Sequence, residues 1–251
     1  MKFWRNIKDF ILSFYYPSGK CFLVSFPKTG QTWLMFMLDK YFNKINSKIN
    51  MPEKTHDCSE IILENGIRID ENYIYKYTDR YKYLRSKVIF LVRDPRDVVV
   101  SHFYQITKRS KNPYIFNSIT EFIRDEKLGF KRIIHFYNLW FSNKNIPQDF
   151  LLIRYEDLLN DGVNTLEIVL KYLNVKISKD IIDQVYLESS SNKMRKLEKE
   201  NRLEGFNNFG NDPNSYKVRK AKIGTFIHEL SDEDIDYCNT CMKELNPFFS
   251  Y

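Results

Sequence analysis

The sequence predicts one α/β domain organised around a parallel sheet. Three apolar runs have the length of buried strands, and they cover residues 22–26, 88–92 and 150–155. The first two runs each pass through a turn into a helical pattern, which is the order expected when helices connect parallel strands. A chain of 251 residues is long enough for one such domain, and no break in composition indicates a second. We therefore expect residues 1–251 to form a single domain.

The net charge of the chain is +7, which favours anionic ligands such as nucleotides, acidic glycans, nucleic acid or an anionic membrane surface. No apolar run reaches the length of a membrane span. Residues 1–17 start with basic residues, but Asp9 interrupts the apolar pattern and no small-residue cleavage site follows. We expect an amphipathic docking helix there, with transient membrane-surface contact as the minor alternative. These features predict a soluble, cytoplasmic protein.

The four cysteines are too few for a disulfide scaffold in a chain of this length. Cys238 and Cys241 form a C-x-x-C pair, but they lie within a helical pattern that Ser231 is placed to cap. A structural zinc site needs a second pair of ligands, and the sequence contains no second cysteine pair. We expect two thiols packed on a helix and no metal site.

The turn between the first strand and its helix has the features of an anion-binding site. Backbone N–H groups at a helix start have no partner within the helix and carry the positive end of its dipole. Lys28 adds a full charge there, and Gly30 permits close approach of a ligand. Thr29 and Thr32 offer hydroxyl donors. The order differs from the Walker loop, in which lysine follows the second of two glycines. The alternative is an ordinary turn with an incidental lysine.

A second unit of the same kind follows the second apolar run. Arg93 lies at the carboxyl end of that strand, where ligands of open α/β sheets bind. Ser101 lies eight residues after Arg93, about two turns into the helix. We expect Arg96 and Asp97 to cap and brace the helix start rather than to contact a ligand.

Lys54 and His56 form a third candidate group. They are separated by one residue, so in an extended segment their side chains point to the same side. A histidine with an unperturbed pKa of about 6.5 is suited to general-base catalysis. A lone histidine is more often a surface or packing residue, and spacing alone leaves that alternative open.

The rest of the chain is mainly helical up to one long polar loop. Helices are expected at residues 118–143 in two segments, at 163–173 and at 178–187. Residues 203–218 form a loop pattern rich in Gly and Asn, which leads into a basic cluster at residues 219–224. We expect this loop to act as a lid, because long loops in compact domains are often functional. A surface loop with solvated charges is the alternative.

Five separated segments, taken in their order along the chain, resemble the sulfotransferases that use 3′-phosphoadenosine 5′-phosphosulfate (PAPS). Residues 26–33 (FPKTGQTW) resemble the loop that binds the 5′-phosphosulfate, and residues 93–101 (RDPRDVVVS) resemble the 3′-phosphate motif. Residues 54–56 (KTH) are similar to the K-T-H of the family, residues 155–157 to its Y-E-D, and residues 219–224 to its late R-K-G-x-x-G. The short, basic form resembles bacterial rather than animal members.

The resemblance implies a three-layer, P-loop-kinase-like α/β fold with a central parallel sheet flanked by helices. It also implies transfer of a sulfuryl group from PAPS to a hydroxyl or amine without a metal, leaving 3′-phosphoadenosine 5′-phosphate (PAP). His56 would be the general base, and Lys28 and Lys54 would donate to the transferring group. The implied cofactor-binding residues are Lys28, Thr29, Gly30, Gln31, Thr32, Trp33, Arg93, Ser101, Tyr155, Ser189, Met194, Arg219 and Lys220.

The sequence departs from the family pattern at three points. Ala221 replaces the glycine expected after Arg-Lys, and Ser191 stands where animal cytosolic members carry an aromatic residue. The interval from Lys28 to His56 is also shorter than in those members. These departures concern the approach to the phosphate, one face of the adenine site and the acceptor side.

Two other functions remain open on the sequence. One is an ATP-dependent small-molecule phosphotransferase of the same fold, although the missing G-K-[ST] argues against it. The other is a non-catalytic binder of acidic glycan or nucleic acid through the basic surface. For the sulfotransferase reading, the acceptor can be a glycan, a lipid or a small hydroxyl compound, and we expect no nucleic-acid partner. The sequence does not fix the oligomeric state.

Overall fold

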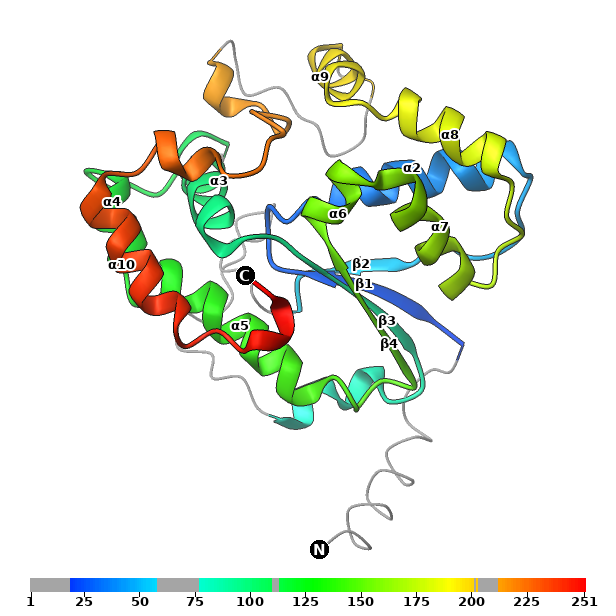
Figure 1. Ribbon diagram of the computed structural model, residues 1–251, viewed down its shortest axis with the longest axis horizontal. Coiled ribbons are helices and arrows are strands. Elements are labelled where there is room, and N and C mark those ends of the chain that lie inside the picture. Colours follow the sequence, from blue (N-terminus) through cyan, green and yellow to red (C-terminus); the bar gives the residue numbers. More distant parts are fainter. Residues whose placement is uncertain (1–18, 58–76, 110–112, 201, 203–211) are drawn as a thin grey trace, which may run out of the picture.

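A parallel sheet of four strands runs through the part of the chain that the structure describes, in the order β2-β1-β3-β4 (Figure 1). The computed structural model describes residues 19–57, 77–109, 113–200, 202 and 212–251. The strands are β1 (Cys21–Ser25), β2 (Glu53–Thr55), β3 (Lys87–Val92) and β4 (Asp149–Arg154). Leu23 of β1 pairs with Lys54 of β2 on one side and with Ile89 of β3 on the other. The expected strands are therefore confirmed.

Helices cover both faces of this sheet and give the protein three layers (Figure 1). One face carries α2 (Gln31–Lys44), α6 (Tyr155–Asn160), α7 (Gly162–Tyr172) and α8 (Lys179–Glu188), and α9 (Ser191–Lys199) follows α8. The other face carries α3 (Pro95–Lys108), α4 (Ile119–Arg124), α5 (Phe130–Asn143) and α10 (Asp232–Met242). Short 3-10 turns are η1 (Tyr77–Tyr83), η2 (Pro213–Ser215), η3 (Thr225–His228) and η4 (Pro247–Phe249). The three-layer α/β fold is as the sequence predicted.

Strand β3 shows why the sequences of the sheet strands are continuous apolar runs. Its side chains alternate between the two faces, as in any strand. Phe90 and Val92 enter the core beside α3, α5 and α10, while Ile89 and Leu91 enter the core beneath α2, α7 and α8. All four side chains are fully buried. A strand covered on both faces has no solvent side, so the polar alternation of a half-exposed strand is missing.

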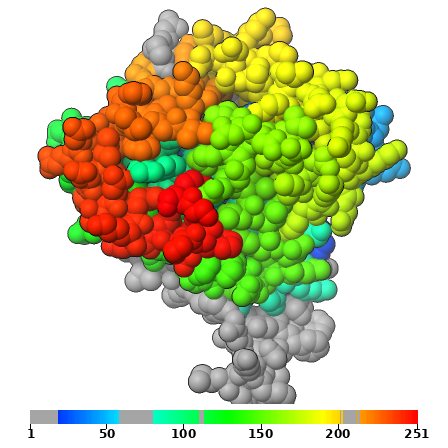
Figure 2. Space-filling view, viewed as in Figure 1, coloured from blue at the N-terminus to red at the C-terminus, as the bar shows by residue number. Residues whose placement is uncertain are grey.

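The C-terminal residues pack beside the edge strand β4. Arg154 donates from Nε to the carbonyl oxygen of Phe249 at 3.0 Å, and the hydroxyl of Tyr251 donates to Glu156 at 2.7 Å. Figure 2 shows the C-terminal residues, in red, between α10 and the green segment that includes β4 and α6. Residues 249–251 therefore pack against the end of β4 and the start of α6.

The remaining local predictions have separate outcomes. The two helical segments expected within 118–143 are α4 and α5, and the helices expected at 163–173 and 178–187 are α7 and α8. Cys238 and Cys241 are buried on α10, which Ser231 caps by accepting a hydrogen bond from the backbone of Asp234. The docking helix expected at 1–17 and residues 203–211 of the expected lid lie outside the described residues.

Across the ranges that the structure describes, none of the helices combines the length and the apolar character that crossing a bilayer requires.

Candidate active site

The two predicted anion-binding turns meet at the guanidinium of Arg93. Strands β1 and β3 are neighbours, so the turns that follow them lie at one edge of the sheet. Arg93 donates from Nη1 to the carbonyl oxygen of Lys28 at 3.5 Å, at the limit of a hydrogen bond, and from Nη2 to that of Lys222 at 3.0 Å. Its guanidinium also lies 4.5 Å from the ring centre of Tyr155 and 3.4 Å from Asp97. One arginine therefore links the lysine turn, the second turn and the late basic cluster.

The first turn is built from two residues with left-handed backbone. Lys28 has a φ of 72° and Gly30 a φ of 101°, and the hydroxyl of Thr29 between them donates to the carbonyl oxygen of Phe26 at 2.9 Å. Gly30 caps α2 without a side-chain acceptor. No side chain caps the first N–H groups of α2, which follow this turn directly. Helix starts of this kind can bind anions through their backbone N–H groups.

Gln31, which the family resemblance places in the phosphosulfate loop, has a structural contact set. Its side-chain nitrogen donates to the carbonyl oxygens of Leu23 at 3.0 Å and Thr55 at 3.1 Å. This side chain therefore ties β1 to β2, and Thr29 is likewise turned inward to Phe26. Their backbone N–H groups are what they can offer to an anion.

Lys28 lies among other cations. Its ammonium donates to Oε1 of Gln105 on α3 at 3.2 Å. Burial lowers the pKa of Lys28 well below its usual value, and the nearby charges of Lys217 and Arg109 lower it further, although Glu198 opposes them. A bound anion would supply the negative charge that this cluster needs, so the electrostatics of the turn fit a phosphate or sulfate group.

His56 lies directly after β2, beside the end of β1. Its Nδ1 is 2.9 Å from the carbonyl oxygen of Ser25, and that contact requires Nδ1 to carry the proton. In the neutral ring, Nε2 then holds the lone pair of a base. Burial lowers the pKa of His56 to about 4, against the Ser25 hydrogen bond that raises it, and Lys217, Lys54 and Lys28 lower it further. Lys54 itself is exposed on the edge strand.

The residues expected around the adenine are partly brought together. Trp33 donates from its indole nitrogen to the carbonyl oxygen of Ser189 at 2.8 Å, and its ring meets that of Tyr155 at 5.8 Å. The hydroxyl of Ser189 is buried and donates to Val185 at 2.7 Å within the end of α8. Met194 is buried on α9. Tyr155 lies between the Trp33 side and Arg93, so it joins the two halves of the site.

Arg219 and Lys220, expected at the 3′-phosphate, are both paired with Glu229. The ammonium of Lys220 lies 2.6 Å from Oε1 of Glu229, and Arg219 contacts the same oxygen. The guanidinium of Arg219 stacks 4.3 Å from the ring centre of Tyr104, whose hydroxyl donates to Glu229 at 2.9 Å. Tyr104 is three residues after Ser101 on α3. Arg219 thus reaches the helix that carries Ser101, and one of its nitrogen atoms donates to an internal carboxylate.

Asp97 of the first turn of α3 also contacts the late segment of the chain. The cap of α3 is Asp94, which accepts a hydrogen bond from the backbone of Arg96 at 2.9 Å. Asp97 instead accepts three hydrogen bonds from residues 224–226, at 2.8, 3.1 and 3.2 Å. Asp97 therefore lies in the first turn of α3, and its carboxylate also holds residues 224–226 against this helix.

The departure at Ala221 has a visible backbone counterpart. Ala221 has a φ of 52°, in the left-handed region that favours glycine. The sequence therefore places a residue with a Cβ atom where the family pattern places glycine, and the turn keeps the conformation. The carbonyl of the next residue, Lys222, accepts from Arg93.

Part of the expected lid is anchored rather than loose. Glu198 of α9 is fully buried and lies 2.8 Å from the guanidinium of Arg109 at the end of α3. It also accepts from the backbone of Lys217 at 2.5 Å and of Val218 at 3.0 Å. Residues 212–218 are therefore tied to both α3 and α9 through one carboxylate, and sequence analysis gave no signal for Glu198.

A second imidazole lies near His56. His102 of α3 is 7% exposed, and its ring meets the edges of Phe26 at 5.4 Å and Phe122 at 5.7 Å. Burial lowers its pKa to about 3, and the charges of Lys28 and His56 lower it further. His102 follows Ser101 directly, but no spacing rule singled it out from the sequence.

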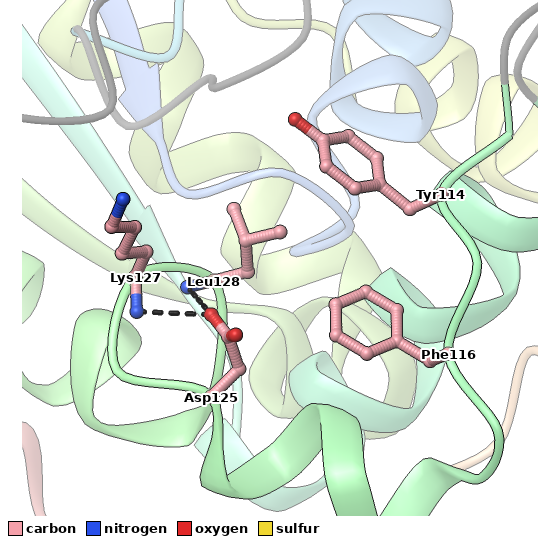
Figure 3. A pocket seen from close by; sticks show the side chains of 5 residues that line it. All are labelled: Tyr114, Phe116, Asp125, Lys127 and Leu128. Atoms are coloured by element: carbon pink, nitrogen blue, oxygen red, sulfur yellow. Dashed lines mark hydrogen bonds between the residues drawn. The ribbon is translucent and has the colours of Figure 1, made fainter.

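A separate pocket of about 330 Å³ lies between the segment after α3 and the α4–α5 turn (Figure 3). It is lined by Tyr114, Phe116, Asp125, Lys127 and Leu128. Asp125 closes its own turn by accepting from the backbone of Lys127 at 3.0 Å and of Leu128 at 2.7 Å. None of the predicted site residues lines this pocket. Within the described ranges, no group of three or more His, Cys, Asp or Glu residues is placed to hold a metal.

Comparison with known proteins identifies the family of this chain. The family model described as "Sulfotransferase domain" matches residues 18–246. Sulfotransferase 2A6 of Rattus norvegicus is 25% identical over 199 residues, which are 74% of this chain and 68% of the relative. Sulfotransferase 2A1 of Mus musculus is 25% identical over 226 residues, 83% of this chain and 78% of the relative. Flavonol 3-sulfotransferase of Flaveria bidentis is 22% identical over 89% of this chain and 80% of the relative.

Solved structures show the same fold. Mouse sulfotransferase SULT7A1, complexed with PAP, superposes with a TM-score of 0.63 at 18% identity, over 92% of this chain and 86% of that one. Retinol dehydratase, in complex with androsterone and the inactive cofactor PAP, gives a TM-score of 0.59 at 16% identity, over 90% and 80% of the two chains. With the family model covering most of its length, this chain belongs to the PAPS-dependent sulfotransferase family.

Proposed function

We propose that the protein transfers the sulfuryl group of PAPS to a hydroxyl or amine by in-line displacement, with His56 as general base. The observation that carries the proposal is the contact of Arg93 with the Lys28 turn, next to His56. The two turns proposed to bind anions are 65 residues apart in the sequence and are in contact there, which would suit a nucleotide with phosphates on both sides of its ribose. The comparisons support the family, and the solved relatives named above hold PAP.

The residues present fit the nucleotide by their charge and chemistry. Lys28 and the first N–H groups of α2 would hold the 5′-phosphosulfate, where burial first and then the nearby charges of Lys217 and Arg109 lower the pKa of Lys28. Arg93 and Ser101 would hold the 3′-phosphate, with Arg219 and Lys220 joining from the late segment. Trp33, Tyr155, Ser189 and Met194 would border the adenine. PAPS when bound supplies the activated sulfuryl group, and every other function here belongs to the protein.

Catalysis would rest on charge placement and one proton transfer. Lys28, and Lys54 from the acceptor side, would stabilise charge on the transferring group and the leaving phosphate. Loss of one such preorganised donor typically costs about 3 kcal/mol in the barrier. His56 would accept the acceptor's proton at Nε2, an effect worth roughly a hundredfold to ten-thousandfold. Its Nδ1–H bond to Ser25 would stabilise the imidazolium that forms.

For the acceptor, we propose a small hydroxyl or amine compound. Three relatives carry a substrate class in their names. They are the 3-beta-hydroxysteroid sulfotransferase of Cavia porcellus, the amine sulfotransferase of Oryctolagus cuniculus and the flavonol 3-sulfotransferase of Flaveria bidentis. Acidic glycans and lipid head groups remain the acceptors that the basic surface would favour. The cytoplasmic location and the bacterial type expected from the sequence stay predictions, since the relatives named here are mammalian and plant proteins.

The test combines binding and transfer. The purified protein should bind PAP at micromolar concentration by calorimetry and should move labelled sulfate from PAPS to members of a phenol, steroid and amine panel. Lys28→Ala should remove both activities, while His56→Ala should remove transfer and spare PAP binding. Failure to bind PAP would reject the proposal, and a preference for ATP with magnesium would favour a phosphotransferase. Full turnover in His56→Ala would move the base elsewhere, with His102 the next residue to replace.

A further inference from the structure

The chain turns sharply immediately after His56. Asp57 has a φ of 46°, which is uncommon for a residue other than glycine and is kept only where its surroundings hold it. Its backbone N–H donates to the hydroxyl oxygen of Thr55 at 3.0 Å, so the turn closes back on β2. The conformation of Asp57 therefore decides how the end of β2 presents His56.

The carboxylate of Asp57 is buried among three groups from η1. Arg80 lies 2.9 Å from Oδ2, Lys82 lies 2.9 Å from Oδ1, and the hydroxyl of Tyr83 donates to Oδ1 at 2.9 Å. The side chains of Asp57 and Arg80 are 1% and 0% exposed. A buried carboxylate with two cations and a hydroxyl has little freedom to move, because every alternative position leaves buried charges without partners.

Tyr83 connects this cluster to the core. Its ring meets Phe22 of β1 at 5.0 Å and Trp140 of α5 at 5.2 Å, and it is fully buried. The anchor of Asp57 is thus part of the main packed layer and not a surface ion pair. A shift of Asp57 would therefore disturb the packing of Tyr83 against β1 and α5.

We propose that Asp57 is a positioning residue for His56, acting through the left-handed turn that Arg80, Lys82 and Tyr83 hold in place. The inference rests on the proposed role of His56 as the base. The imidazole is fixed from two sides: Nδ1 bonds to the carbonyl of Ser25, and the backbone that follows is held by the carboxylate. If the second support is removed, the ring moves relative to the transferring group, and displacements near 1 Å can lower rates about a hundredfold.

The primary variant is Asp57→Asn, which keeps the size of the side chain and tolerates the left-handed backbone but removes the negative charge. PAP affinity by calorimetry should change by less than about threefold, because the nucleotide contacts lie on other elements. PAPS turnover on the acceptor panel should fall about 10-fold to 100-fold. The ¹⁵N NMR shifts of His56 should move from the protonated-Nδ1 pattern towards an average of the two tautomers. This last readout needs no acceptor.

A matched control separates positioning from general stability. Asp234 is also a buried aspartate paired with an arginine, Arg124, and it accepts from Thr120 at 2.8 Å. Asp234→Asn should lower stability by removing a similar pair but should leave the His56 shifts and the turnover unchanged. If Asp57→Asn does not fold, Asp57→Asn with Arg80→Gln removes both buried charges and should show the same altered His56 shifts.

The outcomes are distinct. Unchanged His56 shifts and turnover in a folded Asp57 variant would overturn the proposal. Equal changes in Asp234→Asn would also overturn it, since the effect would then follow stability alone. His56→Ala is measured in parallel: if it keeps full turnover, the proposed base fails, whereas loss in His56→Ala with no loss in Asp57→Asn rejects only the positioning role.

Discussion

Replacing Gly30 by alanine tests how firmly the first anion-binding turn is held by the ring of Tyr155. A Cβ atom at Gly30 would lie 2.6 Å from Cδ2 and 3.1 Å from Cε2 of that ring, and the φ of 101° is strained for alanine. The backbone strain costs about 1–2 kcal/mol. Forcing a methyl group into the packed ring costs about 1–3 kcal/mol more. Gly30→Ala should therefore lower the free energy of unfolding by about 2–5 kcal/mol.

Gly19 offers a matched control for the backbone cost alone. It has a φ of 78°, and a Cβ atom there would meet nothing within 4 Å. Gly19→Ala should lose only the strain of about 1–2 kcal/mol. Urea unfolding of both variants measures the two losses, and their difference is the cost of displacing Tyr155. Because that ring stacks on Arg93 at 4.5 Å, Gly30→Ala should also weaken PAP binding, by about tenfold or about 1.4 kcal/mol, whereas Gly19→Ala should not.

Equal losses of stability in the two variants would refute this reasoning. The Tyr155 ring would then yield without cost, and it could not be the element that fixes the turn. A large loss of stability with unchanged PAP affinity would be equally informative, because it would separate the packing of Tyr155 from the placement of Arg93.

Three further predictions concern charges. His56 should titrate in the free protein with an NMR midpoint at about pH 4, and bound PAP should raise this midpoint. Because the pKa of His56 in the folded protein lies below the ordinary 6.5, the free energy of unfolding should fall as the pH drops from 6.5 towards 4. Glu229→Gln should tighten PAP binding about tenfold. The carboxylate of Glu229 competes with the 3′-phosphate for Arg219 and Lys220, and at short range the two negative charges repel each other. Glu198→Ala should lower the free energy of unfolding by about 3–5 kcal/mol, because the buried charge of Arg109 loses the carboxylate that neutralises it.

Each of these has its own control. The pH titration is compared with that of His56→Gln, which identifies the resonance, and a midpoint above 6 would contradict the assigned burial. For Glu229→Gln the control ligand is 5′-AMP, which lacks the 3′-phosphate and should bind unchanged; weaker PAP binding would mean that Glu229 orients the cations instead. For Glu198→Ala, adding Arg109→Met should recover part of the loss, and no recovery would place the cost in packing.

The strands and the residues at their carboxyl ends were predictable from the sequence because their signals are local. The apolar run of β3 is short and continuous, Arg93 follows β3 directly, and Lys28 lies three residues after the end of β1. Parallel pairing of β1 with β3 then brings both turns to one edge of the sheet. Lys54 and His56 were likewise readable as neighbours on an extended segment.

The partners of these residues were not predictable, because they come from distant parts of the chain. Gln105, which contacts Lys28, lies 77 residues away, and Asp97 holds a segment more than 120 residues further on. Glu229 lies between the basic cluster at residues 219–224 and the acidic start of α10, and nothing in this pattern indicates that it pairs with Arg219. Such contacts depend on how helices pack, and no periodicity in the sequence records that packing.

The link between Asp97 and residues 224–226 has a consequence during synthesis of the chain. The proposed nucleotide site includes Arg219 and Lys220 just before this late segment, so the whole site forms only after the segment has left the ribosome. The four strands of the described part of the chain are all present once β4 has emerged. A nascent chain therefore contains these strands well before it contains the last residues of the proposed nucleotide site.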